Sequence, residues 1–177
     1  MADRKPVSGG RTEAQASVGR DVVARLHKVL ESVVNDKPID ELVKVTMVAV
    51  QATFGMRQLK FAALSPELKG TLPAYSGLKG LDSVHDLHLR EGDRVSPNGF
   101  FTRSEDMLKS YAGEDEDEVA MWREDDSLRF VVRGRSGEPV ACLCVGGTES
   151  GRLPSMTDVE CADLLVQLIG LAVHRDQ

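Results

Sequence analysis

The chain has 177 residues, of which 41% are hydrophobic and 28% are charged, so it is long enough for one domain with an additional arm and too apolar to be disordered throughout. Its net charge of −6 argues against non-specific binding to nucleic acid or to an anionic membrane. No apolar run reaches the ~18 residues of a membrane span, and no secretory signal is recognisable. Only three cysteines are present, too few for a disulfide framework. We therefore expect a cytoplasmic protein.

The N-terminal 35 residues are predicted to form an arm and a helix. Residues 1–11 combine glycine with charged and polar residues, which favours a flexible arm. Residues 12–35 are predicted to be helical because a seam of apolar residues recurs at spacings of 4, 3 and 4. Such a short seam cannot hold a coiled coil alone, so it needs either the domain or a second subunit as its partner. The seam consists of Val22, Leu26, Val29 and Val33, and it is widened by Val18, Val23, Leu30 and Val34.

A helix, two strands and an irregular segment follow. The apolar face of residues 39–54 predicts a helix, and Gly55 suits its C-terminal cap. The apolar run at residues 57–64 predicts a strand, and a weaker strand is predicted near residues 71–75. Within the irregular residues 81–120, the alternating sequence VHDLHL is typical of a further strand.

The last third of the chain predicts a β-hairpin and a long helix. The runs SLRFVVRG and EPVACLCVGG are joined by a turn that contains glycine, and the second run is apolar on both faces, as in a central strand covered on both sides. The capping box Thr157–Glu160 predicts the start of a helix that extends to about Arg175. Because its polar stripe is narrow, this helix is expected to bury nearly its whole circumference. Besides the sheet, the N-terminal helix of the same chain or of a second chain is expected to pack against it. The stripe consists of Glu160, Asp163, Gln167 and His174.

This order of elements resembles a GAF domain. The stretch IDELVKVTMVAVQATFGMRQLKFAAL is similar to the opening helix and first strand of that family, and DDSLRFVVRGRSGEPVACLCVGG followed by SGRLPSMTDVECADLLVQLIGLAV is similar to its closing hairpin and helix. The resemblance covers about residues 39–173 and implies an α+β fold of the PAS/GAF/profilin type, an antiparallel sheet of about six strands with N- and C-terminal helices packed on one face. It also implies a stand-alone GAF domain at residues 36–177, with a ligand pocket on the other face roofed by residues 81–122.

The motifs that mark particular GAF chemistries are mostly absent. Cyclic-nucleotide-binding members carry an Asn-Lys-Phe-Asp-Glu pattern after the last strand, where this chain has Gly146-Gly147. Bilin-binding members attach the chromophore through a cysteine in the middle segment, whereas the first cysteine here is Cys142. Free methionine sulfoxide reductases place redox cysteines around the pocket, at positions that Cys142, Cys144 and Cys161 do not match. The resemblance therefore implies a non-catalytic domain, and no cofactor is expected.

The middle segment holds the candidate ligand pocket. Five of the eight aromatic residues lie between Tyr75 and Trp122, and small-molecule pockets are mostly apolar and aromatic with a few polar anchors. Arg94 and Arg103 are candidate anchors for an anionic ligand. The alternative is that these aromatic residues fill a second small core under long loops. The candidate pocket consists of Tyr75, Arg94, Phe100, Phe101, Arg103, Tyr111 and Trp122.

Two pairs of residues are candidates for redox or metal chemistry. Cys142 and Cys144 share one face of a strand, where same-face neighbours are roughly 6.5–7 Å apart at Cα, at or beyond the usual limit for a disulfide. Buried packing cysteines are therefore predicted. His85 and His88 would share a face on a helix, but on the predicted strand they point in opposite directions, so no metal site is expected.

The sequence thus predicts a sensory or regulatory domain that binds a small molecule or a partner protein and signals through the packing of its terminal helices in a homodimer. A separate output protein would receive the signal, and neither nucleic acid nor a membrane is expected as a partner. Two alternatives stay open: a cysteine-dependent reductase of small oxidised substrates such as free methionine sulfoxide, and a ligand-free interaction scaffold. The candidate dimer interface consists of Val22, Leu26, Val29, Val33, Leu168 and Leu171.

Overall fold

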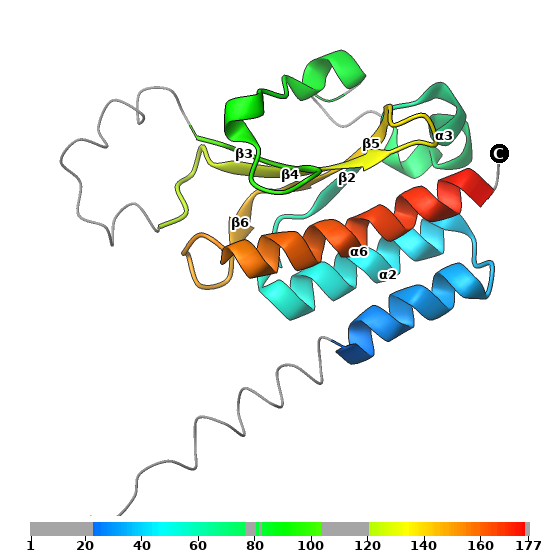
Figure 1. The fold of residues 1–177 in the computed structure, drawn as a ribbon, viewed down its shortest axis with the longest axis horizontal. Helices are drawn as coiled ribbons and strands as arrows, with labels where there is room; N and C mark the ends of the chain where they lie inside the picture. Colours follow the sequence, from blue (N-terminus) through cyan, green and yellow to red (C-terminus); the bar gives the residue numbers. More distant parts are fainter. Residues whose placement is uncertain (1–22, 77–80, 82, 104–120, 176–177) are drawn as a thin grey trace, which may run out of the picture.

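The computed structural model describes residues 23–76, 81, 83–103 and 121–175 (Figure 1). These residues form a mixed α+β fold in which the paired strands are antiparallel, which confirms the α+β part of the predicted fold class. Residues 23–34 are helical, as the apolar seam predicts. The predicted arm (1–11), the start of the predicted N-terminal helix (12–22) and the site candidates Val22 and Tyr111 lie outside the described residues.

The main sheet has four strands, in the order β2 (Lys60–Ala63), β5 (Pro139–Val145), β4 (Ser127–Arg133) and β3 (Gly99–Thr102). β4 and β5 form the predicted hairpin. β5 lies inside the sheet and most of its side chains are buried. The prediction of a central strand covered on both faces is therefore confirmed.

A second, two-stranded sheet is formed by β1 (Met56–Arg57) and β6 (Gly147–Thr148). The sequence predicts one strand over residues 57–64, but the backbone turns at Gln58, whose φ of 53° lies in the left-handed region. This turn separates β1 from β2. The strands are therefore divided between a four-stranded and a two-stranded sheet, instead of forming one sheet of about six.

Helices cover one face of the main sheet in two layers (Figure 1). α2 (Ile39–Phe54) and α6 (Met156–Arg175) lie against the sheet, and the 23–34 helix lies on their outer side. α2 has the predicted bounds and ends at Gly55, whose φ of 61° is a conformation that glycine adopts at low cost. α6 crosses β4 so closely that a Cβ on Gly170 would lie 2.9 Å from a carbonyl oxygen of that strand.

The main core lies between these helices and the sheet. Both helices contribute fully buried aliphatic side chains, and the central strands contribute aromatic and aliphatic ones. Its largest buried members include Leu42, Val43, Val50, Met56, Leu128, Phe130, Leu143 and Ile169.

A smaller apolar cluster covers the opposite face of the sheet. Leu81 and Leu87 pack there with Phe100 of β3 against side chains of β2, β4 and β5. They belong to a segment that contains the short 3-10 helices η2 (Val84–Leu87) and η3 (Glu91–Asp93). We call this group the small cluster; it consists of Ala62, Leu64, Leu81, Leu87, Phe100, Val131 and Cys142.

Two segments that were predicted as strands are short helices. The weaker predicted strand lies in α3 (Pro66–Thr71) and η1 (Pro73–Tyr75), because Ser65 caps a helix there. Within the sequence VHDLHL, the first four residues form η2, because Ser83 and Asp86 form a capping box around its first turn. Local hydrogen bonds from side chains thus override the alternating hydrophobic pattern.

The start of α6 also differs from its prediction. The Oγ atom of Ser155 accepts a hydrogen bond from the Asp158 N–H at 3.1 Å, and α6 begins at Met156. The predicted cap, Thr157, lies inside the first turn. The capping pair is therefore Ser155 and Asp158. Like the predicted pair Thr157 and Glu160, it combines a hydroxyl residue with an acidic residue three positions later, but it lies two positions earlier in the chain.

Candidate functional site

Among the residues that the structure describes, the members of the predicted ligand pocket do not surround one space. Phe100 and Phe101 are consecutive in β3, so their side chains point to opposite faces of the sheet. Phe100 belongs to the small cluster, where the Arg94 guanidinium lies 5.5 Å from its ring centroid. Phe101 packs beside the main core on the other face, in edge contact with Trp122 at a centroid distance of 5.9 Å.

The two arginines predicted as ligand anchors are engaged within the chain. Arg94 forms an ion pair with Glu91 at 3.1 Å. Arg103 is buried, and its Nε and Nη2 atoms each lie 2.9 Å from a carboxylate oxygen of Asp126. Tyr75 packs at the main core. The described members of the predicted pocket therefore stabilise the fold on two sides of the sheet, as expected of aromatic residues that fill cores.

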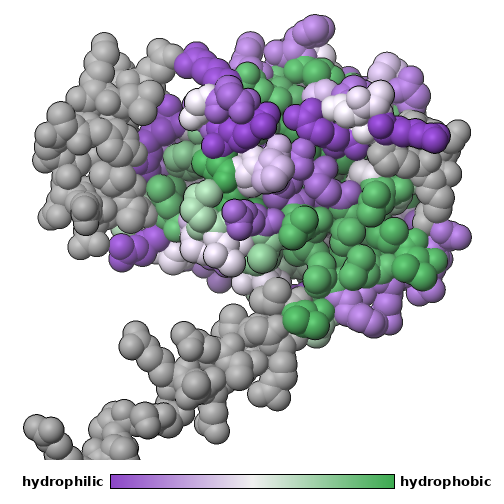
Figure 2. All heavy atoms as spheres, in the orientation of Figure 1, coloured by the Kyte–Doolittle hydropathy of each residue, from purple (hydrophilic) through white to green (hydrophobic). Residues whose placement is uncertain are grey.

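An apolar surface lies over α6 and the 23–34 helix (Figure 2). Exposed apolar residues recur on the 23–34 helix at spacings of 3, 4 and 4, and on α6 at a spacing of 7, so each set follows one face of its helix. The two helices run in the same direction (Figure 1). We call this the apolar helix surface; it consists of Val23, Leu26, Leu30, Val34, Leu164 and Leu171.

Part of the predicted dimer interface faces the interior of its own chain. Val29 is fully buried and Val33 is half-buried against the main core, so these two residues are not available to a second subunit. Leu168 is also half-buried there. Leu26 and Leu171 are exposed. The outer surface of the first helix is therefore formed by Val23, Leu30 and Val34, which widen the seam in the sequence, together with Leu26 of the seam itself.

Two residues of the polar stripe of α6, Asp163 and Gln167, face the domain, whereas Glu160 is exposed. Asp163 is buried, and its carboxylate accepts hydrogen bonds from Ser96 Oγ at 2.8 Å and from the Asn98 N–H at 2.9 Å. Leu164 and Leu171 are instead 68% and 57% exposed. The prediction that this helix buries nearly its whole circumference is therefore wrong for the single chain, because an apolar stripe stays on the surface.

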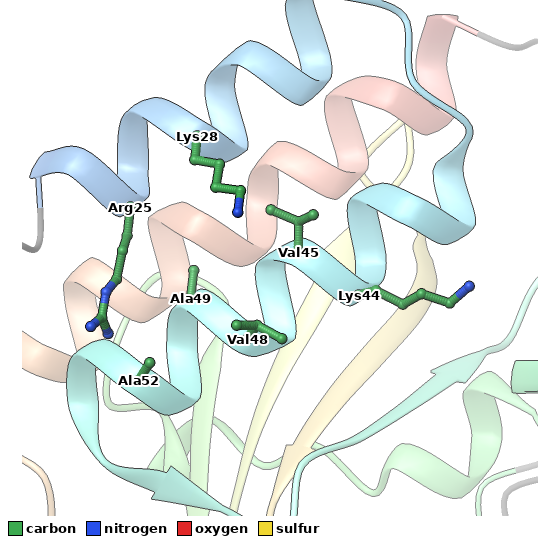
Figure 3. Close-up of a pocket in the computed structure, with 7 residues that line it drawn as sticks. All are labelled: Arg25, Lys28, Lys44, Val45, Val48, Ala49 and Ala52. Carbon is green, nitrogen blue, oxygen red and sulfur yellow. The ribbon is translucent and has the colours of Figure 1, made fainter.

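A groove of about 390 Å³ lies between the 23–34 helix and α2 (Figure 3). Arg25 and Lys28 extend from the first helix over this groove, whereas Lys44 lies at its rim, points away and is paired with Asp40 at 3.0 Å. Sequence reasoning missed this groove, because it predicts the packing faces of two helices but not the space left between them. The floor of the groove is one apolar face of α2, formed by Val45, Val48, Ala49 and Ala52.

The cysteine pair lies on the sheet face that the small cluster covers. The Sγ atoms of Cys142 and Cys144 are 3.8 Å apart, with Cys142 buried and Cys144 half-buried. The hydrogen bond between the thiols, together with the positive charges of Arg129 and Lys60, lowers the pKa of Cys144 although burial opposes the shift. The same hydrogen bond and burial raise the pKa of Cys142 well above its ordinary value. Cys144 is therefore the stronger nucleophile of the pair.

We expect Cys144 to react with an alkylating reagent in the native protein, and Cys142 to react only after unfolding. The rate should rise with pH as the Cys144 thiol ionises, with a midpoint at a lower pH than that of an unperturbed cysteine, because the pKa of Cys144 is lowered. Arg129→Gln should slow the reaction at pH 7 because it removes a positive charge that lowers the pKa. Mass spectrometry of a Cys161→Ser background measures this, with Arg135→Gln as the matched control. A faster reaction at Cys142 would contradict the assignment.

In the described part of the chain, no group of three His, Cys, Asp or Glu side chains is arranged to hold a metal ion, and none of the helices there is both long and apolar enough to cross a membrane. No protein-family model matches the sequence, and no curated protein matches it significantly.

Proposed function

We propose that the protein is a non-catalytic regulatory module with a GAF-like architecture, and that it acts as a homodimer through the apolar helix surface. The exposure of apolar side chains on two neighbouring helices carries this proposal. Contiguous apolar surfaces of this kind are typical of sites that bind other proteins. The helical layers on one sheet face and the short helices on the other support the comparison with GAF domains.

We expect a second copy of the chain to cover this surface. The 23–34 helix and α6 run in the same direction, and this pair can pack against the same pair of a second chain about a two-fold axis. Each fully buried Val or Leu side chain stabilises association by ~1.5–3 kcal/mol. Two sets of partly exposed side chains therefore contribute on the order of 10 kcal/mol, which is comparable to the roughly 4–15 kcal/mol that association costs. The two terms nearly cancel, so the dimer is expected to be weak and to form only at high protein concentration.

Regulation would use the outer position of the 23–34 helix. This helix joins α2 through residues 35–38 and packs on the domain through Val29 and Val33. A ligand or partner protein that binds better to one packing of the helix shifts the population toward that packing. Because the same helix contributes to the apolar helix surface, the shift changes the geometry of the dimer that a separate output protein would recognise.

Leu30→Glu and Leu171→Glu are each expected to convert the dimer into a monomer, because a charge would be buried without a partner at the centre of the interface. Sedimentation velocity should give about twice the 19.3 kDa chain mass for the wild type and one chain mass for each variant. Met121→Glu, at an exposed apolar residue outside the apolar helix surface, is the matched control and should remain dimeric. A wild-type protein that stays monomeric at several hundred micromolar would refute the dimer.

Two alternative functions have support from particular observations. The lowered pKa of Cys144 favours a cysteine-dependent reductase, and a native protein whose thiols fail to react with the alkylating reagent would exclude it. The side chains of the small cluster, which occupy the sheet face opposite the helices, favour a ligand-free interaction scaffold. A thermal-shift screen against nucleotides, amino acids and metabolites tests the scaffold, because any specific ligand should raise the melting temperature.

A further inference from the structure

We infer that the groove between the 23–34 helix and α2 binds a free amphipathic carboxylate, a single alkyl chain of about eight to ten carbons that ends in a carboxylate. This inference goes beyond the proposed function, because the groove and the apolar helix surface use different flanks of the first helix. Lys28 and Leu30 are two residues apart in the sequence, or about 200° around the helix axis. A ligand in the groove therefore leaves the dimer surface accessible.

The floor of the groove fits an alkyl chain. It extends from Val45 to Ala52 along α2, which is about 10 Å at 1.5 Å per residue and comparable to an extended chain of about eight carbons. Small side chains at Ala49 and Ala52 leave room above the helix (Figure 3). Val48 is 65% exposed at the edge of this floor, so covering it with a methylene chain removes apolar surface from water.

The positive charges over the floor fit a carboxylate. Figure 3 shows the guanidinium of Arg25 above Ala52 and the ammonium of Lys28 near Val45 and Ala49. Arg25 donates a hydrogen bond of 3.4 Å to the neutral hydroxyl of Thr53, and within the described residues neither cation forms an ion pair with a carboxylate. Arginine recognises a carboxylate through two parallel hydrogen bonds. A carboxylate held by Arg25 and Lys28 would place its alkyl chain along the floor.

Other occupants fit this groove less well. An anionic membrane would be repelled by the net charge of −6, and the groove is recessed between two helices. A peptide helix is about 10–12 Å wide, too wide for a groove of about 390 Å³. An uncharged alkyl chain would leave both cations without a carboxylate partner. The charge and the shape together favour a free carboxylate.

Titration of the full chain with decanoate, followed by isothermal calorimetry, tests the inference. We expect one site per chain below the micellar concentration of decanoate. Decanol, which has the same chain and no charge, should bind at least about tenfold more weakly, and acetate should not bind. Arg25→Gln combined with Lys28→Gln should weaken decanoate binding about tenfold or more. Arg135→Gln, which removes one positive charge in the β4–β5 turn away from the groove, should leave binding unchanged.

A second variant tests the groove without changing its charge. Ala52→Leu introduces a good helix former at an exposed position, and its side chain should fill the floor and abolish binding without lowering the melting temperature. The inference is overturned if decanoate does not bind the wild type, if decanol binds equally well, or if either groove variant binds like the wild type. Binding of the wild type to anionic vesicles but not to decanoate would equally overturn it.

Sedimentation of the same variants separates this inference from the proposed dimer. The Arg25→Gln and Lys28→Gln variant should keep the mass of the wild type, because both residues lie away from the apolar helix surface. A monomeric wild type that still binds decanoate would refute the dimer alone, and a dimeric wild type that does not bind it would refute the groove alone.

Discussion

Replacing Arg103 with methionine is expected to lower the free energy of unfolding by about 3–5 kcal/mol. Arg103 and Asp126 are 8% and 4% exposed and are joined by two hydrogen bonds of 2.9 Å. Asp126 also accepts a hydrogen bond from the Arg123 N–H at 2.8 Å, just before β4 begins. Methionine would fill much of the volume of the arginine but leave the carboxylate buried without a counter-ion. Urea unfolding followed by circular dichroism measures the loss.

Two further variants establish that the loss comes from the buried charge. Arg103→Met combined with Asp126→Leu should be more stable than Arg103→Met alone, because no unpaired charge then remains in the interior. Arg57→Met removes one partner of an exposed ion pair with Glu149, and it should change the free energy of unfolding by less than about 1 kcal/mol. Equal losses for Arg103→Met and Arg57→Met would refute the role given to burial.

The elements predicted correctly are those in which local pattern and tertiary packing agree. α2 has its predicted bounds because a continuous apolar face, an acidic first turn and a glycine cap all favour the same helix. The β4–β5 hairpin likewise combines a short turn with two apolar runs. VHDLHL was predicted wrongly because the capping box of Ser83 and Asp86 stabilises a helical turn that the alternation of apolar residues does not reveal.

The candidate site was less predictable, because a hydrophobic pattern does not say which of two neighbouring faces is covered. Along the first helix, Val29 and Leu30 are equally apolar, yet Val29 is fully buried and Leu30 is 40% exposed. On α6 the carboxylate of Asp163 is drawn inward by hydrogen bonds from residues 96–98, which turns Leu164 outward. Such choices depend on contacts between residues that are distant in the sequence. They could not be predicted from spacing alone.

Phe130→Ala is expected to lower the free energy of unfolding by about 3–5 kcal/mol. Phe130 is fully buried at the centre of the main core, opposite Leu143 in the neighbouring strand β5. Helices on one side and the sheet on the other hold the surrounding side chains in place, so the cavity left by the ring cannot collapse fully. The same urea titration measures this loss, and an m-value equal to that of the wild type would show that unfolding stays two-state.

Phe100→Ala is the matched comparison, because it removes the same ring from the other face of the sheet. Phe100 is 3% exposed, but the small cluster is covered by short 3-10 helices and not by long ones. These helices can move toward the sheet more easily than α2 or α6, so the loss is expected to be at least about 1 kcal/mol smaller than for Phe130→Ala. Equal losses would mean that the segment over residues 83–95 is packed as rigidly as the helical layer. It would then be unable to yield to a small molecule on that face, and regulation would have to act through the helices alone.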